Sequence, residues 1–236
     1  MDYIFPSTYS IKLMQSNFDL IIFDCDGVLV DSERVANAVF AKVLEEECGL
    51  QFSLEEMFDH FVGHSKAQCL QIVEDMTGSP PSPVLADRYR QDINQALQDS
   101  VEAVNGIESV LQTIGIPYCV ASSGSHEKMA ATLGKTGLVK YFDGNIYSTS
   151  EVANGKPHPD IYLHAARSSG IDDSDRCLVI EDSPIGVKGA VAAGMTVFGY
   201  AELMPAEKLL AQGAHRAFAR MQDLFSEMHD YLNGGG

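Results

Sequence analysis

The sequence lacks several features that mark particular classes of protein. Its 236 residues include no tryptophan, and 16 lysine and arginine residues face 33 aspartate and glutamate residues, a formal net charge of −17. Because so acidic a chain is repelled by phosphate backbones and by anionic lipid, we expect no nucleic-acid partner and no membrane partner. The overall charge does not argue against a small anionic substrate, since a single site can be locally positive.

Paired cysteines are also missing. The five cysteines are odd in number and form no CxxC pair, and Cys119 and Cys177 lie inside apolar runs. We therefore expect reduced, buried thiols in a reducing compartment, with no cysteine-bound metal. The first residues lack the basic start and apolar centre of a signal peptide, and no apolar run approaches the ~18 residues of a membrane span. These absences predict a cytoplasmic protein.

What is present is an alternation of short apolar runs with helical patterns. The runs are apolar on both faces, which is typical of strands inside a parallel sheet. They occupy residues 18–23, 116–121, 145–148, 177–181 and 196–200. Because helical patterns separate them, the sequence predicts the α/β class, with a doubly wound, Rossmann-like parallel sheet.

One long segment interrupts this alternation. Residues 32–103 show helical patterns and no convincing strand, with capping boxes expected at Ser53 and Ser65. We therefore expect an α/β core of residues 17–31 and 104–231, and an inserted helical bundle of residues 32–103, which the resemblance described below identifies as a catalytic core and a cap. Residues 1–16 would be an N-terminal extension without an assigned role, and residues 232–236 a flexible tail.

Carboxyl groups gather at the ends of two predicted strands. Asp24 and Asp26 follow the first strand, where Gly27 permits a tight turn and close approach of the backbone. Glu181 and Asp182 stand at the end of another strand, before a proline that can open a helix. Mg²⁺ prefers such oxygen ligands, together with water and phosphate oxygens. Each pair alone could instead be a solvated strand end or a helix cap.

Two further segments offer groups that bind phosphate. Ser122, Ser123 and Gly124 follow a strand and precede a helix, so that backbone N–H groups, a hydroxyl and the helix dipole can face an anion. Lys156 supplies a cation between a glycine and a proline. A serine-rich turn and a surface lysine are the alternatives. Since parallel strands end at the same edge of a sheet, these segments together predict one site for a phosphate and a cation.

The order of these motifs resembles the haloacid dehalogenase superfamily, over the chain from Phe18 to about Arg220. The sequence DCDGV at 24–28 matches its first motif, the Ser122 loop its second, GKPHPD at 155–160 its third and EDS at 181–183 its fourth. The helical insert resembles the mobile cap of its members. The similarity is strongest to sugar-phosphate phosphatases and β-phosphoglucomutases, and residues 119–142 are similar to bacterial 6-phosphogluconate-type phosphatases.

The resemblance implies a role for each motif residue in phosphoryl transfer. Asp24 would attack phosphorus and form an aspartyl-phosphate, which water then hydrolyses. Asp26 would protonate the leaving alcohol and later deprotonate that water. Ser122 would donate a hydrogen bond to the phosphoryl group, and Lys156 would neutralise it and restrain Asp24.

The resemblance also implies a magnesium cofactor. Asp182 would hold Mg²⁺ together with the carboxylate of Asp24 and the backbone carbonyl of Asp26. Glu181 would be an occasional ligand, or would support the residues that are ligands.

Substrate contacts are expected from both parts of the chain. Gly27, Ser123 and Gly124 would line the phosphate site. In the cap, a segment with His64, Ser65 and Lys66 would meet the body of the substrate, and so could Arg88 or Arg90. Each of these charged cap residues could instead be a solvated surface charge.

The aspartate at position 26 restricts which of the superfamily's activities we expect. Its dehalogenases do not need an acid two residues after the nucleophile, and its ATPases usually have threonine there. We therefore expect Mg²⁺-dependent hydrolysis of a small phosphorylated metabolite, a sugar phosphate or sugar-acid phosphate, by a monomer, with a dimer as the alternative. The alternative is a sugar phosphomutase, although residues 31–38 lack the histidine that β-phosphoglucomutases carry in the first cap helix. Nothing in the sequence supports a non-catalytic binding module.

Overall fold

A computed structural model describes residues 17–62, 64 and 66–234 of the chain. The chain divides into two compact units, Asp31–Glu102 and the remainder, Met1–Val30 with Ala103–Gly236. These boundaries fall one residue before those expected for the cap, 32–103. The expected N-terminal extension, residues 1–16, lies outside the described residues. The last helix continues through Leu232, the first residue assigned above to a flexible tail.

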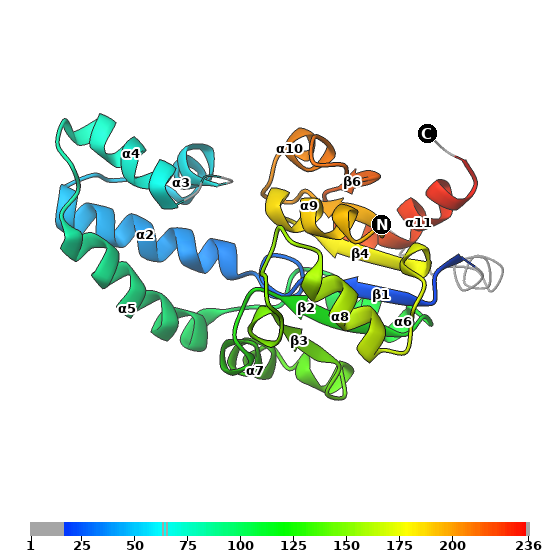
Figure 1. The fold of residues 1–236 in the computed structure, drawn as a ribbon. Helices are drawn as coiled ribbons and strands as arrows, with labels where there is room; N and C mark the ends of the chain where they lie inside the picture. Colours follow the sequence, from blue (N-terminus) through cyan, green and yellow to red (C-terminus); the bar gives the residue numbers. More distant parts are fainter. Residues whose placement is uncertain (1–16, 63, 65, 235–236) are drawn as a thin grey trace. The chain divides into compact units, whose positions relative to one another are not determined.

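A parallel sheet forms the centre of the first unit (Figure 1). Its strands are β1 (Leu20–Phe23), β2 (Tyr118–Ser122), β3 (Ile146–Ser148), β4 (Cys177–Glu181), β5 (Thr196–Tyr200) and β6 (Arg216–Phe218). They lie in the order β3-β2-β1-β4-β5-β6, and every neighbouring pair is parallel. Since β1 lies between β2 and β4, the direction of winding changes at β1. This confirms the predicted doubly wound fold.

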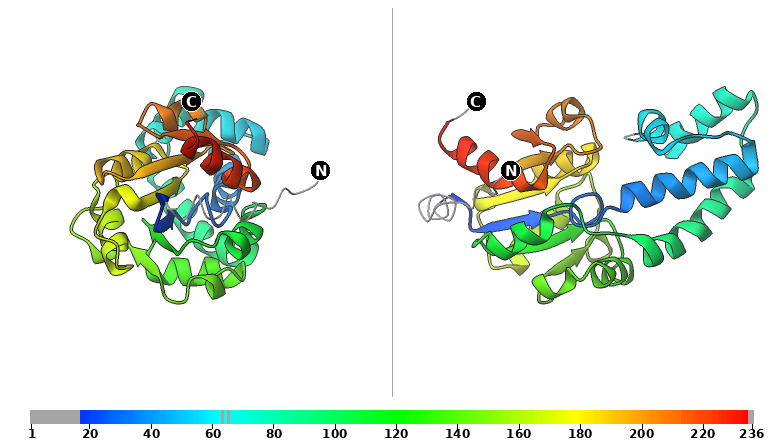
Figure 2. Two further views of the ribbon diagram at one scale, coloured as in Figure 1. Left: turned by 90° about the vertical axis from the view of Figure 1, so that its right-hand side faces the viewer. Right: turned by 180° about the vertical axis from the view of Figure 1, so that it is seen from behind.

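Helices cover both faces of this sheet (Figure 2). They are α6 (Ile107–Thr113), α7 (His126–Lys135), α8 (Asp160–Ser168), α9 (Pro184–Ala192), α10 (Ala206–Leu210) and α11 (Leu224–Leu232), with 3₁₀ turns η1 (Val139–Tyr141), η2 (Thr149–Glu151), η3 (Ser174–Arg176) and η4 (Met221–Asp223). Residues of α8, α9 and α10 pack with Leu20 and Ile22 in one apolar cluster. On the opposite face, the ring of Tyr231 in α11 contacts Phe198. Alternate residues of each inner strand therefore face two separate helical layers.

The strands differ in how clearly the sequence pattern predicts them. All four residues of β1 are at most 1% exposed, as expected for a central strand without a polar face. Burying each such aliphatic or aromatic side chain stabilises the fold by about 1.5–3 kcal/mol. The edge strand β6 was not predicted, because it has only three residues, two of them partly buried, and contains no apolar run.

The second unit consists of helices among its described residues. They are α2 (Ser32–Cys48), α3 (Leu54–Phe61), α4 (Lys66–Thr77) and α5 (Pro83–Ser100). Ser53 and Glu56 form the predicted capping box at the start of α3. The box expected at Ser65 falls on a residue outside the described part. Apolar side chains from all four helices form the core of this unit; they include Val43, Leu44, Met57, Phe61, Val73 and Leu85. In the described parts of both units, no helix is long and apolar enough to cross a membrane.

Candidate active site

The motif residues stand at the carboxyl ends of the three central strands. Asp24 follows β1, Ser122 ends β2, and Glu181 ends β4. Because β1 pairs with both β2 and β4, these strand ends are neighbours in the sheet. This is the point where the winding direction changes, and there open parallel sheets bind their ligands.

Lys156 joins two of these strand ends through its ammonium group. Its Nζ donates to Oδ1 of Asp24 at 2.6 Å and to Oε2 of Glu181 at 2.7 Å, and its side chain is only 3% exposed. Burial by itself lowers the pKa of Lys156, but the charges of Asp24 and Glu181 outweigh it and raise that pKa well above its ordinary value. Lys156 is therefore a permanently charged group inside the site.

Asp24 is held by its backbone as well as by Lys156. Its N–H donates to the carbonyl of Ile180 in β4 at 2.9 Å, and its side chain is 8% exposed. Burial, followed by the charge of Glu181, raises the pKa of Asp24 to about 7, although Lys156 acts in the opposite direction. One ammonium thus does not compensate all the carboxylates here, and the site favours an additional cation.

Glu181 accepts hydrogen bonds at both carboxylate oxygens. Oε1 accepts from the backbone N–H and the hydroxyl of Ser183, and Oε2 accepts from Lys156 and from the hydroxyl of Tyr162. Burial alone raises the pKa of Glu181, but the charge of Lys156 and these hydrogen bonds outweigh it and leave the pKa below its ordinary value. A Cβ at Gly186 would lie 2.1 Å from the Glu181 carboxyl carbon, so only glycine leaves room for this arrangement.

Asp24, Glu181 and Asp182 could together hold a metal ion. Each offers a carboxylate oxygen, and these three oxygens lie within 4.8 Å of one another. Among the described residues, this is the group of His, Cys, Asp or Glu side chains that is close enough together to share a metal ion. An all-oxygen, negatively charged donor set fits Mg²⁺. Gly27 lies close to the metal group: its φ is +80°, and a Cβ there would lie 1.9 Å from Oδ2 of Asp182, while its expected contact with substrate stays a prediction.

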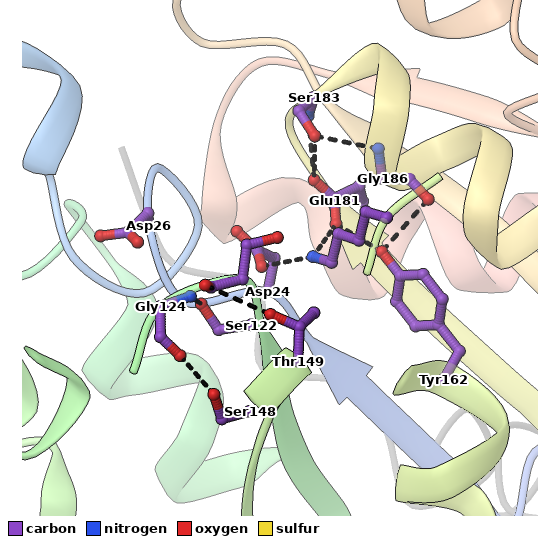
Figure 3. A network of polar contacts seen from close by, with 12 residues as sticks. Asp24, Asp26, Ser122, Gly124, Ser148, Thr149, Tyr162, Glu181, Ser183 and Gly186 are labelled. Atoms are coloured by element: carbon purple, nitrogen blue, oxygen red, sulfur yellow. Dashed lines mark hydrogen bonds and ion pairs between the residues drawn. The ribbon is translucent and has the colours of Figure 1, made fainter. Parts of the chain in front are cut away.

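The loop after β2 is braced by the last residue of β3 and the residue that follows it (Figure 3). The hydroxyl of Ser148 donates to the carbonyl of Gly124 at 2.7 Å, and that of Thr149 donates to the carbonyl of Ser123 at 3.3 Å. Within the loop, Oγ of Ser122 accepts from the N–H of Gly124 at 3.0 Å. These contacts hold the predicted phosphate-binding loop in one conformation, and the sequence had not indicated Ser148 or Thr149.

Asp26 belongs to a different network. Figure 3 shows it on the loop after β1, with its carboxylate turned away from that of Asp24. Its Oδ2 accepts from Nζ of Lys128 at 2.7 Å. Sequence reasoning missed Lys128 and also Tyr162, because a lysine and a tyrosine inside ordinary helical patterns carry no motif signal. Lys128 stands in the first turn of the helix that follows the Ser122 loop, and this placement was the only clue.

The expected substrate residues of the cap lie in the second unit. His64 and Lys66 are exposed, and Ser65 lies outside the described residues. Arg88 forms ion pairs with Glu46 and Glu47, and Arg90 pairs with Asp87 at 3.0 Å. Roles of these residues toward a substrate stay predictions.

Comparison with known proteins decides the family. A model described as haloacid dehalogenase-like hydrolase matches residues 21–200. The chain belongs to this family. The predicted resemblance is thereby confirmed, and so is the expectation of a hydrolytic enzyme.

Relatives of this haloacid dehalogenase-like hydrolase include named phosphatases of Escherichia coli (strain K12). Its 6-phosphogluconate phosphatase is 30% identical over 184 residues, which cover 78% of this chain and 82% of the relative. Its fructose-1-phosphate phosphatase is 29% identical over 184 residues, covering 77% and 96%. These names agree with the predicted phosphomonoester hydrolase.

Solved structures show the same fold. A conserved haloacid dehalogenase-like protein from Agrobacterium tumefaciens has a TM-score of 0.83 and 38% identity, covering 91% of this chain and 99% of that one. A family hydrolase from Deinococcus radiodurans with bound phosphate and sodium has a TM-score of 0.78 and 32% identity, covering 93% and 97%.

Proposed function

We propose that this enzyme hydrolyses a small phosphomonoester, a sugar phosphate or sugar-acid phosphate, through an aspartyl-phosphate on Asp24. The observation that supports this most directly is the buried carboxylate of Asp24, paired with Lys156 at the end of the central strand and adjacent to the carboxylates of Glu181 and Asp182. The names of the two phosphatases of Escherichia coli support the substrate class, and the phosphate bound to the hydrolase of Deinococcus radiodurans supports phosphate recognition.

In the first step, a carboxylate oxygen of Asp24 attacks phosphorus, and the bond between phosphorus and the substrate alcohol breaks. Asp26 gives a proton to the departing alcohol oxygen, which keeps the electron pair of the broken bond. Lys156, restrained by Glu181, orients Asp24 and offsets negative charge. Ser122, at the end of the neighbouring strand, donates a hydrogen bond to the phosphoryl group.

In the second step, water attacks the phosphorus of the aspartyl-phosphate, and Asp26 takes its proton. The bond between phosphorus and Asp24 breaks, which releases inorganic phosphate and restores the carboxylate. Asp24 and Asp182, with the backbone carbonyl of Asp26, would hold Mg²⁺. When bound, this ion offsets the negative charges of the nucleophile and the phosphate, which otherwise repel each other. Glu181 is assigned as the support of Lys156, because both its oxygens already accept hydrogen bonds.

The predicted alternative, a sugar phosphomutase, is not favoured. The curated relatives above are named as hydrolases of phosphorylated sugars and sugar acids. The first cap helix, α2, also carries no histidine at its start.

The test is phosphate release from a panel of phosphorylated sugars, sugar acids and nucleotides by the purified protein with MgCl₂. We expect turnover of at least one sugar or sugar-acid phosphate, and loss of at least ~10³-fold in Asp24→Asn, because the nucleophile is gone. Addition of EDTA should abolish turnover reversibly. A wild-type protein inert on the whole panel, or full activity in Asp24→Asn, would refute the proposal.

A further inference from the structure

Lys128 makes a contact that the mechanism above does not use. It lies in the first turn of α7, where its own N–H donates to Oγ of the N-cap residue Ser125 at 3.2 Å. Its ammonium reaches back to the loop after β1 and pairs with Oδ2 of Asp26 at 2.7 Å. Residues 102 positions apart are thus joined at the expected proton donor of the reaction.

The two oxygens of Asp26 have different surroundings. Oδ2 is bound by Lys128, whereas Oδ1 is buried and has no hydrogen-bond partner. A buried oxygen without a partner is costly, and such groups are retained where a ligand or a reaction uses them. The ion pair therefore holds the carboxylate by one oxygen and leaves the other for an incoming group.

The backbone of the loop that carries Asp26 is held by its own hydrogen bonds. The N–H of Gly27 donates to the carbonyl of Val30 at 2.8 Å, and the N–H of Leu29 donates to the carbonyl of Cys25 at 3.0 Å. The remaining freedom of Asp26 is rotation of its side chain, and the contact with Lys128 removes that freedom.

Lys156 cannot perform this task, since its ammonium is shared between Asp24 and Glu181. Lys128 is also tied to the phosphate loop, because a Cβ on Gly124 would lie 3.6 Å from the Cδ atom of Lys128. Its aliphatic stem therefore passes beside that loop. One helix thus connects the position of Asp26 with the loop that binds the phosphoryl group.

We propose that Lys128 is a positioning residue that holds Asp26 so that its free oxygen meets the oxygen of the leaving alcohol. The proposal rests on the proposed function of Asp26. As the phosphorus–oxygen bond breaks, the proton moves from Asp26 to the alcohol oxygen, and the carboxylate that remains is paired with the ammonium of Lys128. The contribution of Lys128 is then required only where the leaving oxygen needs a proton.

Two substrates separate this role from a general structural one. A sugar phosphate that the wild type hydrolyses has an alkyl alcohol as its leaving group, which needs a proton. The leaving group of p-nitrophenyl phosphate is stable without one. The ratio kcat/KM covers the steps up to transfer of phosphorus to Asp24, so the later activation of water does not enter the comparison.

For Lys128→Met we expect kcat/KM to fall on the order of 10- to 100-fold with the alkyl phosphate and to change little with p-nitrophenyl phosphate. Lys128→Arg should recover most of the loss, because it restores a cation. In an Asp26→Asn background, Lys128→Met should cost nothing further with the alkyl phosphate, since the residue acts through Asp26. Lys135→Met, at the exposed end of the same helix, is the matched control and should resemble wild type.

Thermal denaturation of each variant shows whether it is folded, and Lys128→Arg keeps the comparison valid if the methionine variant is unstable. Equal losses with both substrates would overturn the proposal, and so would an additive loss in the Asp26→Asn background. A rise in KM confined to the alkyl phosphate, with kcat unchanged, would also overturn it and make Lys128 a substrate contact. Wild-type turnover on the panel remains a separate result, so failure here leaves the proposed phosphatase activity intact.

Discussion

The charged residues at the candidate active site of the first unit differ in exposure from the charged residues of the second unit that were expected to contact substrate. In the first unit, Lys156, Asp24 and Glu181 are each at most 8% exposed and lie within 2.7 Å of their partners. In the second unit, the side chain of Arg88 is 38% exposed and that of Arg90 is 66% exposed. The comparison shows where a role can be assigned from structure: a buried charge has few permitted partners, whereas an exposed one has many.

The energetics explain this contrast. Removing an ion from water costs several kcal/mol, so a buried charge is stable only when its partners are all in place. An exposed ion pair keeps most of its hydration and is screened by salt, so its geometry is weakly determined. The chemistry of the first unit can therefore be argued from contacts, while substrate selection by the second unit has to be measured.

The largest expected effect is that of Lys156→Met. It leaves Asp24 and Glu181 buried without their shared cation, so we expect turnover to disappear and the free energy of unfolding to fall by about 3–5 kcal/mol. Urea denaturation in EDTA measures the second quantity. The exposed-lysine variant Lys135→Met is the control, and a Lys156→Met protein as stable as that control would contradict the contrast between buried and exposed charge.

A second effect, of opposite sign on stability, is expected for Asp24→Asn in the absence of metal. The pKa of Asp24 is about 7 in the folded protein, against an ordinary value of 3.8, so the folded state binds this proton more tightly than the unfolded state. The free energy of unfolding of the wild type therefore decreases as pH rises from about 4 to 7, and the full cost is present above pH 7. Asparagine removes that cost.

We therefore expect Asp24→Asn to be more stable than wild type by up to about 4 kcal/mol at pH 8, because each unit of raised pKa corresponds to about 1.4 kcal/mol, with the difference vanishing toward pH 4. Urea denaturation in EDTA at a series of pH values gives the result. Added Mg²⁺ should stabilise the wild type more than the variant. A variant less stable than wild type at pH 8 would show that the buried charge of Asp24 does not destabilise the folded protein.

The smallest expected effect is that of Arg88→Gln in the second unit. Because the ion pairs of Arg88 with Glu46 and Glu47 are only partly shielded from solvent, we expect little change in the midpoint of urea denaturation, and less still at high salt. A several-fold rise in KM with kcat unchanged would instead identify Arg88 as a substrate contact. That outcome would sharpen the comparison by assigning one exposed charge of the cap.

Most of the fold was predictable because its signals are local. The five predicted strands are all present, since each is an apolar run bounded by polar or turn residues, and the capping box at Ser53 needs only residues three apart. Strand β6 was missed because a short edge strand buries too little to leave such a run. Chain topology then follows from general rules for parallel strands, which explains why motifs far apart in sequence could be expected at one edge.

The sequence by itself therefore determined which residue types stand at the ends of β1, β2 and β4. Only the tertiary structure decided which of them touch. It paired Lys128 with Asp26 and placed the hydroxyl of Tyr162 on Glu181. It also showed that Gly27 and Gly186 leave space for the carboxylates of Asp182 and Glu181. The physical reason is range: backbone propensity and apolar periodicity act over a few residues, whereas packing and charge pairing act between atoms that the folded chain alone brings together.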